Sequence, residues 1–244
     1  MNEESVMKNK SYHPLPEPVA PELLERVRRL SPALLCDGMQ NSGIARNGCM
    51  DADIVPVDES KVLLGTACTV ETSGGDNFPV HVAIYQGCPG YVLVVAGRND
   101  TERAYLGDLL AGAAQATGLD GIVVDGCVRD KQALAELDIP VYARGFMPRG
   151  PVKEKHGEIN TPVQCAGVVV TPGDLVFGDA DGVVVVPRSR LEEVLDNAEK
   201  KLAYEIQRRE VIEAYQQGRE CGGPLPALAP AWVTDILFGK PDKK

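Results

Sequence analysis

The sequence contains no long apolar run. Its N-terminal stretch, MNEESVMKNKSYHPLPEPVAPE, lacks the apolar core of a signal peptide. Nowhere does an apolar stretch reach the roughly 20 residues that a membrane-spanning helix needs. We therefore expect a cytoplasmic protein with no membrane partner.

Positive charge is also scarce. The chain has 25 Lys and Arg against 35 Asp and Glu, which gives a formal net charge of -10 and a pI near 4.9. Proteins that bind nucleic acid set clustered positive charge against the phosphates. The composition thus argues against DNA or RNA as a ligand.

Paired cysteines and grouped histidines are missing as well. The seven cysteines include no C-x-x-C pair, so neither a zinc site nor a disulfide framework is indicated, and free thiols are expected. Of the three histidines, His13 falls in a polar arm and His81 on a helix with apolar neighbours, which favours structural roles. His156 lies in a loop that could reach a site across a subunit boundary.

Signatures of several other catalytic classes are absent. No Walker-type loop and no G-x-G-x-x-G after a strand supports a nucleotide cofactor. Lys153 and Lys155 share a glycine- and charge-rich loop, a poor place for the desolvated lysine of a Schiff-base aldolase. The acidic GDADG stretch, 178–182, lacks the ligand spacing of an EF-hand and predicts a tight turn between strands.

At 244 residues, the chain is long enough for one substantial core. We predict a flexible, proline-spaced arm over 1–20, an α/β domain over 21–187, a long charged helix over 188–218 that Gly218 stops, and a tail over 219–244. Trp232 could anchor this tail against another chain.

Strands and helices alternate through the predicted domain. Helices are expected from Pro21 and, with Ser31 as the cap, from 32 onward. Further along, the expected elements are strands over 61–72, 91–97, 122–125 and 139–145, with helices over 76–87, 107–118 and 129–138 between them. This alternation predicts a parallel βαβ layer. The following stretch, 161–187, holds short strands with no room for helices, which predicts an antiparallel meander that closes the sheet into a barrel or sandwich.

Two strand ends carry the candidate site. Ligands of open α/β sheets bind beyond the carboxyl ends of the strands. The strand over 91–97 leads to a glycine-led helix start, whose free backbone N–H groups suit a carboxylate. The next strand, 122–125, reaches a glycine turn and then Arg129 and Asp130. If the two strands are neighbours, both loops open onto one pocket.

These groups together suit a short 2-oxo acid. Arg129 offers a planar fork for an anion, and Asp130 a carboxylate for a hard cation. One protein carboxylate with several waters suits Mg²⁺ or Mn²⁺, which could stabilise an enolate and so permit C–C cleavage beside pyruvate. Metal-bound water is the first candidate for the proton carrier and Asp108 the second. The backbone groups expected to hold the substrate carboxylate are those of Gly107, Asp108, Leu109 and Leu110.

The segments GDLLAGAAQATGLDGIVVDGCVRD, IPVYARG and GVVVTPGDLVFGDADGVVVVP resemble the RraA-like family, which includes class II aldolases acting on 4-hydroxy-4-methyl-2-oxoglutarate and 4-carboxy-4-hydroxy-2-oxoadipate. The resemblance spans roughly 31–187. It implies an α/β fold, an αββα sandwich or small barrel like a phosphohistidine swivelling domain, assembled as a homotrimer or hexamer with sites between subunits. It also implies that Arg129 contacts substrate, that Asp130 holds the metal, and that the amides of 107–110 bind the pyruvyl carboxylate.

One position departs from the aldolase pattern. The family's signature has an acidic residue three positions after the aspartate, where this chain has Ala133. Two hypotheses follow. The first is a metal-dependent lyase that releases pyruvate from a 2-oxo acid by retro-aldol cleavage or by oxaloacetate decarboxylation. The alternative is a non-catalytic regulator that binds a ribonuclease or another protein, as some family members do. The intact set of Gly107, Arg129 and Asp130 favours the enzyme.

Overall fold

The structure is a computed structural model that describes residues 11–40, 42–153 and 157–239. The chain divides into two compact units, 1–198 and 199–244. His156 and Lys155, singled out in the sequence, lie outside the described residues.

A mixed sheet forms the centre of the first unit. Within the described residues it has eight strands in the order β1-β5-β4-β3-β2-β9-β10, and β6 pairs with β2. The strands are β1 (Val55–Pro56), β2 (Leu63–Glu71), β3 (Tyr91–Ala104), β4 (Gly121–Val128), β5 (Val141–Phe146), β6 (Glu158–Ile159), β9 (Leu175–Asp179) and β10 (Gly182–Val186). The two end strands, β1 and β10, come into contact, so the sheet is a nearly closed barrel.

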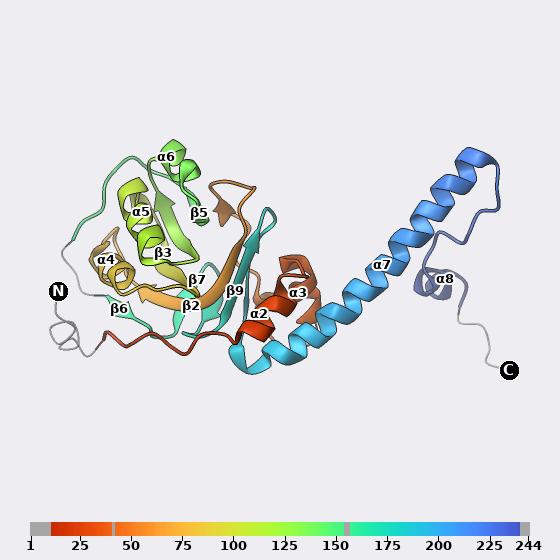
Figure 1. Ribbon diagram of the computed structural model, residues 1–244, viewed down its shortest axis with the longest axis horizontal. Coiled ribbons are helices and arrows are strands. Elements are labelled where there is room, and N and C mark those ends of the chain that lie inside the picture. The colour runs from red at the N-terminus through yellow and green to blue at the C-terminus, as the bar shows by residue number, and fades with distance from the viewer. Residues whose placement is uncertain (1–10, 41, 154–156, 240–244) are drawn as a thin grey trace. The chain divides into compact units, whose positions relative to one another are not determined.

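Strands β2, β3, β4 and β5 pair in parallel, as the alternating sequence predicted. The connecting helices are α4 (Phe78–Tyr85), α5 (Asp108–Thr117) and α6 (Lys131–Glu136). Figure 1 shows these three helices together on one face of the sheet. Their apolar side chains, such as Ile84, Ala111 and Leu134, form one core with the strand residues beneath them.

The opposite face holds a second core beside the antiparallel part of the fold. Strand β9 pairs antiparallel with β2 and with β10, and β7 (Val163–Cys165) with β8 (Val168–Val170) forms a separate hairpin. The predicted antiparallel strands are therefore present, but they form two separate hairpins rather than one meander, and of the two only β9–β10 extends the main sheet. The acidic stretch 178–182 is the turn between β9 and β10, where the Asp181 N–H donates to Asp179 Oδ1 at 2.9 Å. A tight turn was the prediction for this stretch.

Two strands run further than the sequence indicated. Strand β3 continues past Gly97 to Ala104, with Arg98 and Asn99 both at a φ of 58°. Its pairing with β4 shifts register twice. The segment after Gly97, which the sequence indicated as a connection, is therefore a bulged part of the strand. Likewise β4 runs through Gly126, where the sequence indicated a turn. The glycine instead leaves room for the Tyr105 ring, because a Cβ at position 126 would lie 2.6 Å from it.

The segment before the domain is held against the sheet where the structure describes it. The His13 N–H donates to the Ile159 carbonyl at 3.0 Å, and the Val19 N–H donates to Thr66 Oγ1 at 2.8 Å. Val19 itself is buried. Residues 11–20 are therefore packed rather than flexible, a correction to the predicted arm that proline spacing alone could not foresee.

Two short helices and two 3₁₀ turns complete the first unit. They are α2 (Pro21–Val27), α3 (Pro32–Gly38) and the 3₁₀ turns η1 (Ala45–Gly48) and η2 (Arg188–Arg190). Ser31 caps α3 by accepting from the Leu34 N–H at 3.2 Å, as expected from its place before proline. All seven cysteines are free thiols in the structure.

Helix α7 (Leu191–Cys221) begins in the first unit and continues through the second. It does not stop at Gly218: it ends at Cys221, before Gly222 adopts a φ of +68°. One isolated glycine costs a helix only about 1 kcal/mol, too little to end it. A further helix, α8 (Ala231–Phe238), lies in the predicted tail.

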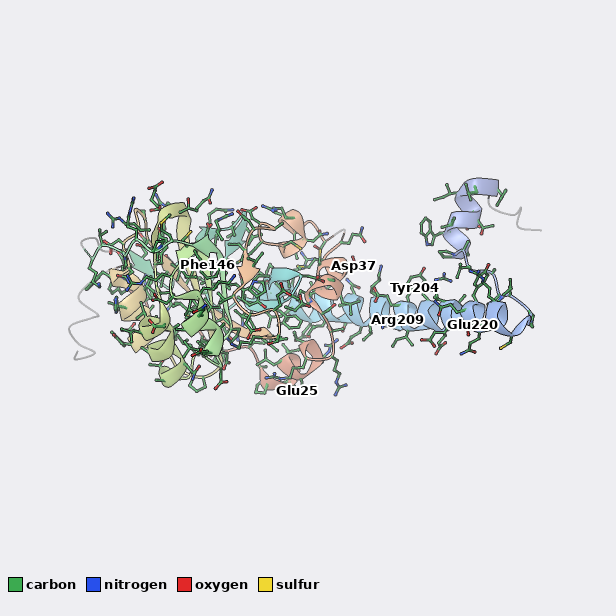
Figure 2. All side chains as sticks on the ribbon, turned by 90° about the horizontal axis from the view of Figure 1, so that it is seen from above. Glu25, Asp37, Phe146, Tyr204, Arg209 and Glu220 are labelled. Atoms are coloured by element: carbon green, nitrogen blue, oxygen red, sulfur yellow. The ribbon has the colours of Figure 1, made fainter. Side chains whose placement is uncertain are left out.

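Side chains of the second unit are largely exposed. Figure 2 labels Tyr204, Arg209 and Glu220 along α7, and Trp232 of α8 is 59% exposed. Among the helices that the structure describes, none combines the length and apolar character needed to cross a membrane.

Candidate active site

The carboxyl ends of three parallel strands meet around one cavity of about 340 Å³. Strand β3 leads to the start of α5, β4 leads to Arg129, and β2 leads to the start of α4. The described residues that line the cavity are Asn77, His81, Tyr85, Leu106, Gly107, Asp108, Leu109, Leu110, Arg129, Pro151 and Lys153. The strands β3 and β4 are neighbours, so the two loops singled out in the sequence open onto one pocket.

Gly107 lies directly against the Arg129–Asp130 pair. A Cβ at position 107 would be 2.1 Å from Asp130 Oδ2 and 2.9 Å from Arg129 Cγ, closer than real atoms approach. The Arg129 Nε is 3.4 Å from the same carboxylate oxygen. Glycine is therefore required for the α5 start and the charged pair to share this space.

Asp130 adopts a left-handed backbone conformation, with a φ of 61° and a ψ of 46°, just before α6. Its side chain caps no helical N–H group. Aspartate tolerates this conformation better than most residues, but it still costs free energy. Such strain at a charged loop residue is typical of functional sites, since the fold around it must hold the residue in place.

The start of α5 presents backbone donors to the cavity. Gly107 is its N-cap, and no side chain caps the helix. The N–H groups of the first turn have no partner within the helix, and the positive end of the helix dipole favours an anion there. Backbone bonding fixes the neighbouring loop, because the Arg129 N–H donates to the Leu106 carbonyl at 3.0 Å.

Six lining residues escaped the sequence prediction, and Asn77, His81 and Lys153 are among them. The signal that could have found Asn77 and His81 is β2, a strand that the sequence predicted and that runs parallel to β3. Its carboxyl end lies at the same sheet edge, so the helix that follows it had to border the same pocket. The sequence predicted only a structural role for His81, but the residue also lines the cavity.

Asn77 contributes an acceptor to this wall. Its side chain is 3% exposed, and its Nδ2 donates to the Tyr105 carbonyl at 2.9 Å. That bond fixes the orientation of the amide, and its Oδ1 accepts no hydrogen bond from any residue the structure describes. Buried polar atoms are normally paired, so the free oxygen suits a donor group of a ligand or water.

Burial and the nearby Lys153 ammonium lower the pKa of His81 below its ordinary value. The imidazole is consequently neutral at pH 7 and adds no charge to the cavity. Arg129 and Lys153 are the positive side chains of the wall, and Asp108 is the negative one.

The donor set around Asp130 fits a hard divalent cation. Among the described residues, no group of three or more His, Cys, Asp or Glu side chains could hold a metal ion. Zinc sites in proteins need three or four such ligands, whereas Mg²⁺ commonly takes one or two carboxylates and several waters. The single carboxylate of Asp130, beside Gly107 and Arg129, suits this second pattern.

A buried ion cluster braces the same strands from within. Arg144 of β5, whose side chain is 7% exposed, donates through Nε to Asp125 Oδ1 at 2.5 Å and through Nη2 to Asp51 Oδ2 at 2.7 Å. It also pairs with Asp53. Burial lowers the pKa of Arg144, but the hydrogen bonds that it donates to its three carboxylate partners outweigh this effect and raise it. The guanidinium thus stays charged and ties β4 to β5.

Three residues weighed in the sequence, Asp130, His13 and Ala133, are not among the residues that line the cavity. Asp130 lies beside the cavity wall, with its Oδ2 3.4 Å from Nε of Arg129. His13 binds the sheet through its backbone, as described above. Ala133, at the position where the aldolase pattern has an acidic residue, is half-buried in α6.

The model of the RraA-like family, described as Aldolase/RraA, matches residues 32–185. The chain belongs to the RraA-like family. The matched range contains every residue of the cavity wall, from Asn77 to Lys153.

Several relatives of this RraA-like protein have been named or solved. A Halalkalibacterium halodurans protein named "Putative 4-hydroxy-4-methyl-2-oxoglutarate aldolase" is 40% identical over 67% of this chain and 78% of its own length. The solved RraAS2 of Streptomyces coelicolor, titled an unusual member of the RNase ES inhibitor RraA protein family, has a TM-score of 0.69 at 30% identity, covering 78% of this chain and 98% of its own. An uncharacterized Pseudomonas syringae protein matches with a TM-score of 0.69 at 28% identity, over 85% of this chain and 96% of its own.

Proposed function

We propose that this RraA-like protein is a divalent-metal-dependent lyase that releases pyruvate from a short 2-oxo acid. One observation carries the proposal: the α5 start and Arg129 line one cavity, and Asp130 lies directly beside both, so close that a Cβ at position 107 would be 2.1 Å from Asp130 Oδ2. A protein that binds partners only through its rim does not need such a constellation. The aldolase name of the Halalkalibacterium relative supports the same reaction class.

The binding roles follow from the chemistry of each group. The N–H groups of the first turn of α5 would hold the substrate carboxylate, which the helix dipole favours. The Arg129 guanidinium would donate to the 2-oxo oxygen and stabilise the negative charge that grows on it as the C–C bond breaks.

In the retro-aldol reaction, the C3–C4 bond of a 4-hydroxy-2-oxo acid breaks. The C4 hydroxyl loses its proton to a base, C4 becomes a carbonyl carbon, and the bonding electron pair passes into the enolate of pyruvate. Protonation of C3 then gives pyruvate. Asp108, in the cavity wall at the first turn of α5, would be the side chain that carries the proton.

Asp130 would hold the metal, Mg²⁺ or Mn²⁺. When bound, such an ion supplies Lewis-acid stabilisation of the enolate charge. Oxaloacetate decarboxylation proceeds through the same enolate, with CO₂ rather than a carbonyl compound leaving from C3. The same residues therefore serve both reactions.

The test is pyruvate release, coupled to lactate dehydrogenase, from 4-hydroxy-4-methyl-2-oxoglutarate and from oxaloacetate. The protein is assayed with Mg²⁺, with EDTA, and as the Asp130→Ala variant. Turnover that requires the metal and disappears in the variant is the expected result. A folded protein that releases pyruvate from neither substrate contradicts the proposal.

A second candidate function has support from the solved relatives. RraAS2 is named after a ribonuclease inhibitor family, and this chain carries a net charge of -10 that would suit a basic protein partner. Absence of turnover, together with inhibition of a ribonuclease E-type enzyme by the purified protein, would favour this regulatory role over the lyase.

A further inference from the structure

Two thiols that do not line the cavity face each other in the structure. The Cys49 Sγ is 3.3 Å from the Cys36 Sγ, at hydrogen-bonding distance for sulfur. Cys36 lies in α3, and Cys49 follows directly after η1. Both are free thiols and half-buried, so solvent reaches this pair. The proposed lyase reaction uses neither of them.

The backbone on both sides of the pair is fixed. The Cys49 N–H donates to the Arg46 carbonyl at 3.0 Å, and Cys49 forms a bridge with Val184 of β10. On the other side, Gly38 lets α3 lie against α7, because a Cβ there would be 2.6 Å from the Val194 carbonyl oxygen. The fold therefore keeps the two sulfur atoms close to each other.

Solvent access separates the cysteines into two groups. Three are buried, and burial raises the pKa of their thiols: Cys68, Cys127 and Cys165. The thiolate is the reactive form of cysteine, so these three should be inert. Four are half-buried or exposed: Cys36, Cys49, Cys88 and Cys221. Within this accessible group, the described side chains bring Cys36 and Cys49 into sulfur–sulfur contact.

The two members of the pair differ in what they can do first. Desolvation by burial, and then the hydrogen bond with Cys36, raise the pKa of Cys49 to about 12. Cys49 is consequently a poor first nucleophile, which leaves the first attack to Cys36. The part of the rise that comes from the charge and hydrogen bond of Cys36 disappears once Cys36 is bound to another sulfur atom.

We propose that Cys36 and Cys49 form a reversible modification site, at which a small disulfide such as glutathione disulfide converts the two thiols into an intramolecular disulfide. This inference does not depend on the proposed lyase function. It assigns to Cys36 the attack on the small disulfide and to Cys49 the role of resolving thiol.

The reaction is two successive thiol–disulfide exchanges. The Cys36 thiolate attacks one sulfur of the small disulfide, whose S–S bond breaks, and the first small thiolate leaves. Cys49 then loses its proton to solvent, and its sulfur attacks Cys36 Sγ and displaces the second small thiolate. The protein pair is oxidised by two electrons, and the small disulfide is reduced to two thiols, which take up the two protons.

The product would fasten the segment 36–49, which contains η1. A disulfide bond is about 2.0 Å long, so the sulfur atoms must approach by roughly 1.3 Å. The crosslink would also hold Arg46, which donates to Asp51 Oδ1 at 2.6 Å, beside the Arg144 cluster. Because a closed loop restricts the unfolded chain, the oxidised protein should be more stable than the reduced one.

The test incubates the reduced full-length protein with glutathione disulfide at about pH 8, where exposed thiols are partly ionised. Remaining thiols are blocked with iodoacetamide, and proteolytic peptides are identified by mass spectrometry. The expected product is a peptide pair joined through Cys36 and Cys49, which dithiothreitol separates. In urea without reductant, the oxidised protein should unfold at a midpoint about 1 M higher than the reduced protein.

Three variants identify the role of each thiol. Cys49→Ser lacks the resolving thiol, so a glutathione adduct should accumulate on Cys36 and the shift in urea should vanish. Cys36→Ser should leave Cys49 largely unmodified, because burial, the largest cause of its raised pKa, remains. Cys88→Ser is the matched control, because it removes another half-buried thiol and should still form the linked peptides and show the full shift.

Several results would overturn the proposal. In one, the exposed Cys221 takes up glutathione while Cys36 and Cys49 stay free in the folded protein. In another, the wild type keeps a glutathione adduct on Cys36, which means that the packing prevents the sulfur atoms from approaching. A bond from either thiol to Cys88 would assign a different pair. An unchanged urea midpoint of the linked protein would overturn the stabilising effect.

Discussion

The carboxylate of Asp130 occupies the space that a side chain at position 107 would need. The distance from Asp130 Oδ2 to a Cβ built on Gly107 is 2.1 Å, although 23 residues separate the two in the sequence. Gly107 also begins α5, whose first turn offers its N–H groups to the cavity. The candidate metal ligand and the helix start that we propose to bind the substrate carboxylate are therefore fixed relative to each other by close packing.

Gly107→Ala should disturb both the Asp130 carboxylate and the start of α5. The added methyl group must displace the Asp130 carboxylate or the stem of Arg129, and a misplacement of about 1 Å can cost about 100-fold in rate. Overpacking of this kind also costs about 1–3 kcal/mol of stability. Pyruvate release and urea unfolding measure the two effects.

Gly112→Ala is the control in the same helix. A Cβ at position 112 has no neighbouring atom within 4 Å. Alanine at this site should leave activity unchanged and stabilise the helix by about 0.5–1 kcal/mol. Equal activity in Gly107→Ala and Gly112→Ala would show that the contact with Asp130 is unimportant.

Asp130→Asn should separate charge from backbone strain. Asparagine tolerates the left-handed conformation that Asp130 adopts, so the free energy of unfolding should stay within about 1 kcal/mol of wild type. Removing a residue that hydrogen-bonds to a metal ligand typically lowers metal affinity or activity about 10–100-fold. Removing the charge of the ligand itself should lower activity by at least as much. The measurement is pyruvate release over a Mg²⁺ titration, with Mn²⁺ tested after EDTA treatment. Full activity of the variant at low Mg²⁺ would contradict a metal-binding role for Asp130.

Much of this site could be predicted from the sequence, because it depends on local patterns. The strands before Gly107 and Arg129 are apolar and continuous, and the helix between them is bounded by Gly107 and Gly118, which takes a φ of 87° at its end. Those signals place both loops at one sheet edge without any knowledge of long-range contacts. The pairing of β3 with β4 then brings them together.

The remaining half of the cavity depends on contacts that no local pattern encodes. Lys153 reaches the wall only because Val152 bonds to Gly75, about 75 residues earlier in the chain. The extension of β3 depends on bulges whose register is set by β4 and by the Tyr105 ring. Residues 11–20 read as an arm, since proline spacing does not reveal that Val19 and Thr66 bond.

Arg144→Met should be strongly destabilising. It leaves Asp125, which is 4% exposed, without its cation partner, and removing one partner of a buried ion pair typically costs about 3–5 kcal/mol. Urea unfolding measures the loss. The control is Arg98→Met, because Arg98 pairs with Glu71 at the surface with a side chain that is 66% exposed, and such pairs contribute about 1 kcal/mol or less. A similar loss in both variants would mean that burial of the Arg144 cluster adds nothing.

Asp51 should make stability depend on pH at the acid end. Hydrogen bonds from Arg144 and then from Arg46 lower its pKa below the ordinary value of about 3.9. As the pH falls, the unfolded chain therefore takes up the proton first, and the folded state loses relative stability. The stabilisation is complete above about pH 5 and is lost as the pH falls through the lower folded-state pKa. Urea unfolding of wild type and Asp51→Asn should accordingly differ by a constant amount from pH 5 to 8 and converge towards pH 2–3.

Asp174 provides a comparison of opposite sign. Its side chain is 5% exposed, and burial raises its pKa even though hydrogen bonds from the Arg188 and Thr171 N–H groups lower it. The folded state here keeps its proton to a higher pH than the unfolded chain does. As the pH rises from the ordinary carboxyl pKa of about 3.9, the wild type should therefore lose stability relative to Asp174→Asn. Relative to Asp51→Asn, the wild type should instead gain stability as the pH rises towards about 5. Parallel pH profiles of the two variants would mean that Arg144 and Arg46 do not set the ionisation of Asp51.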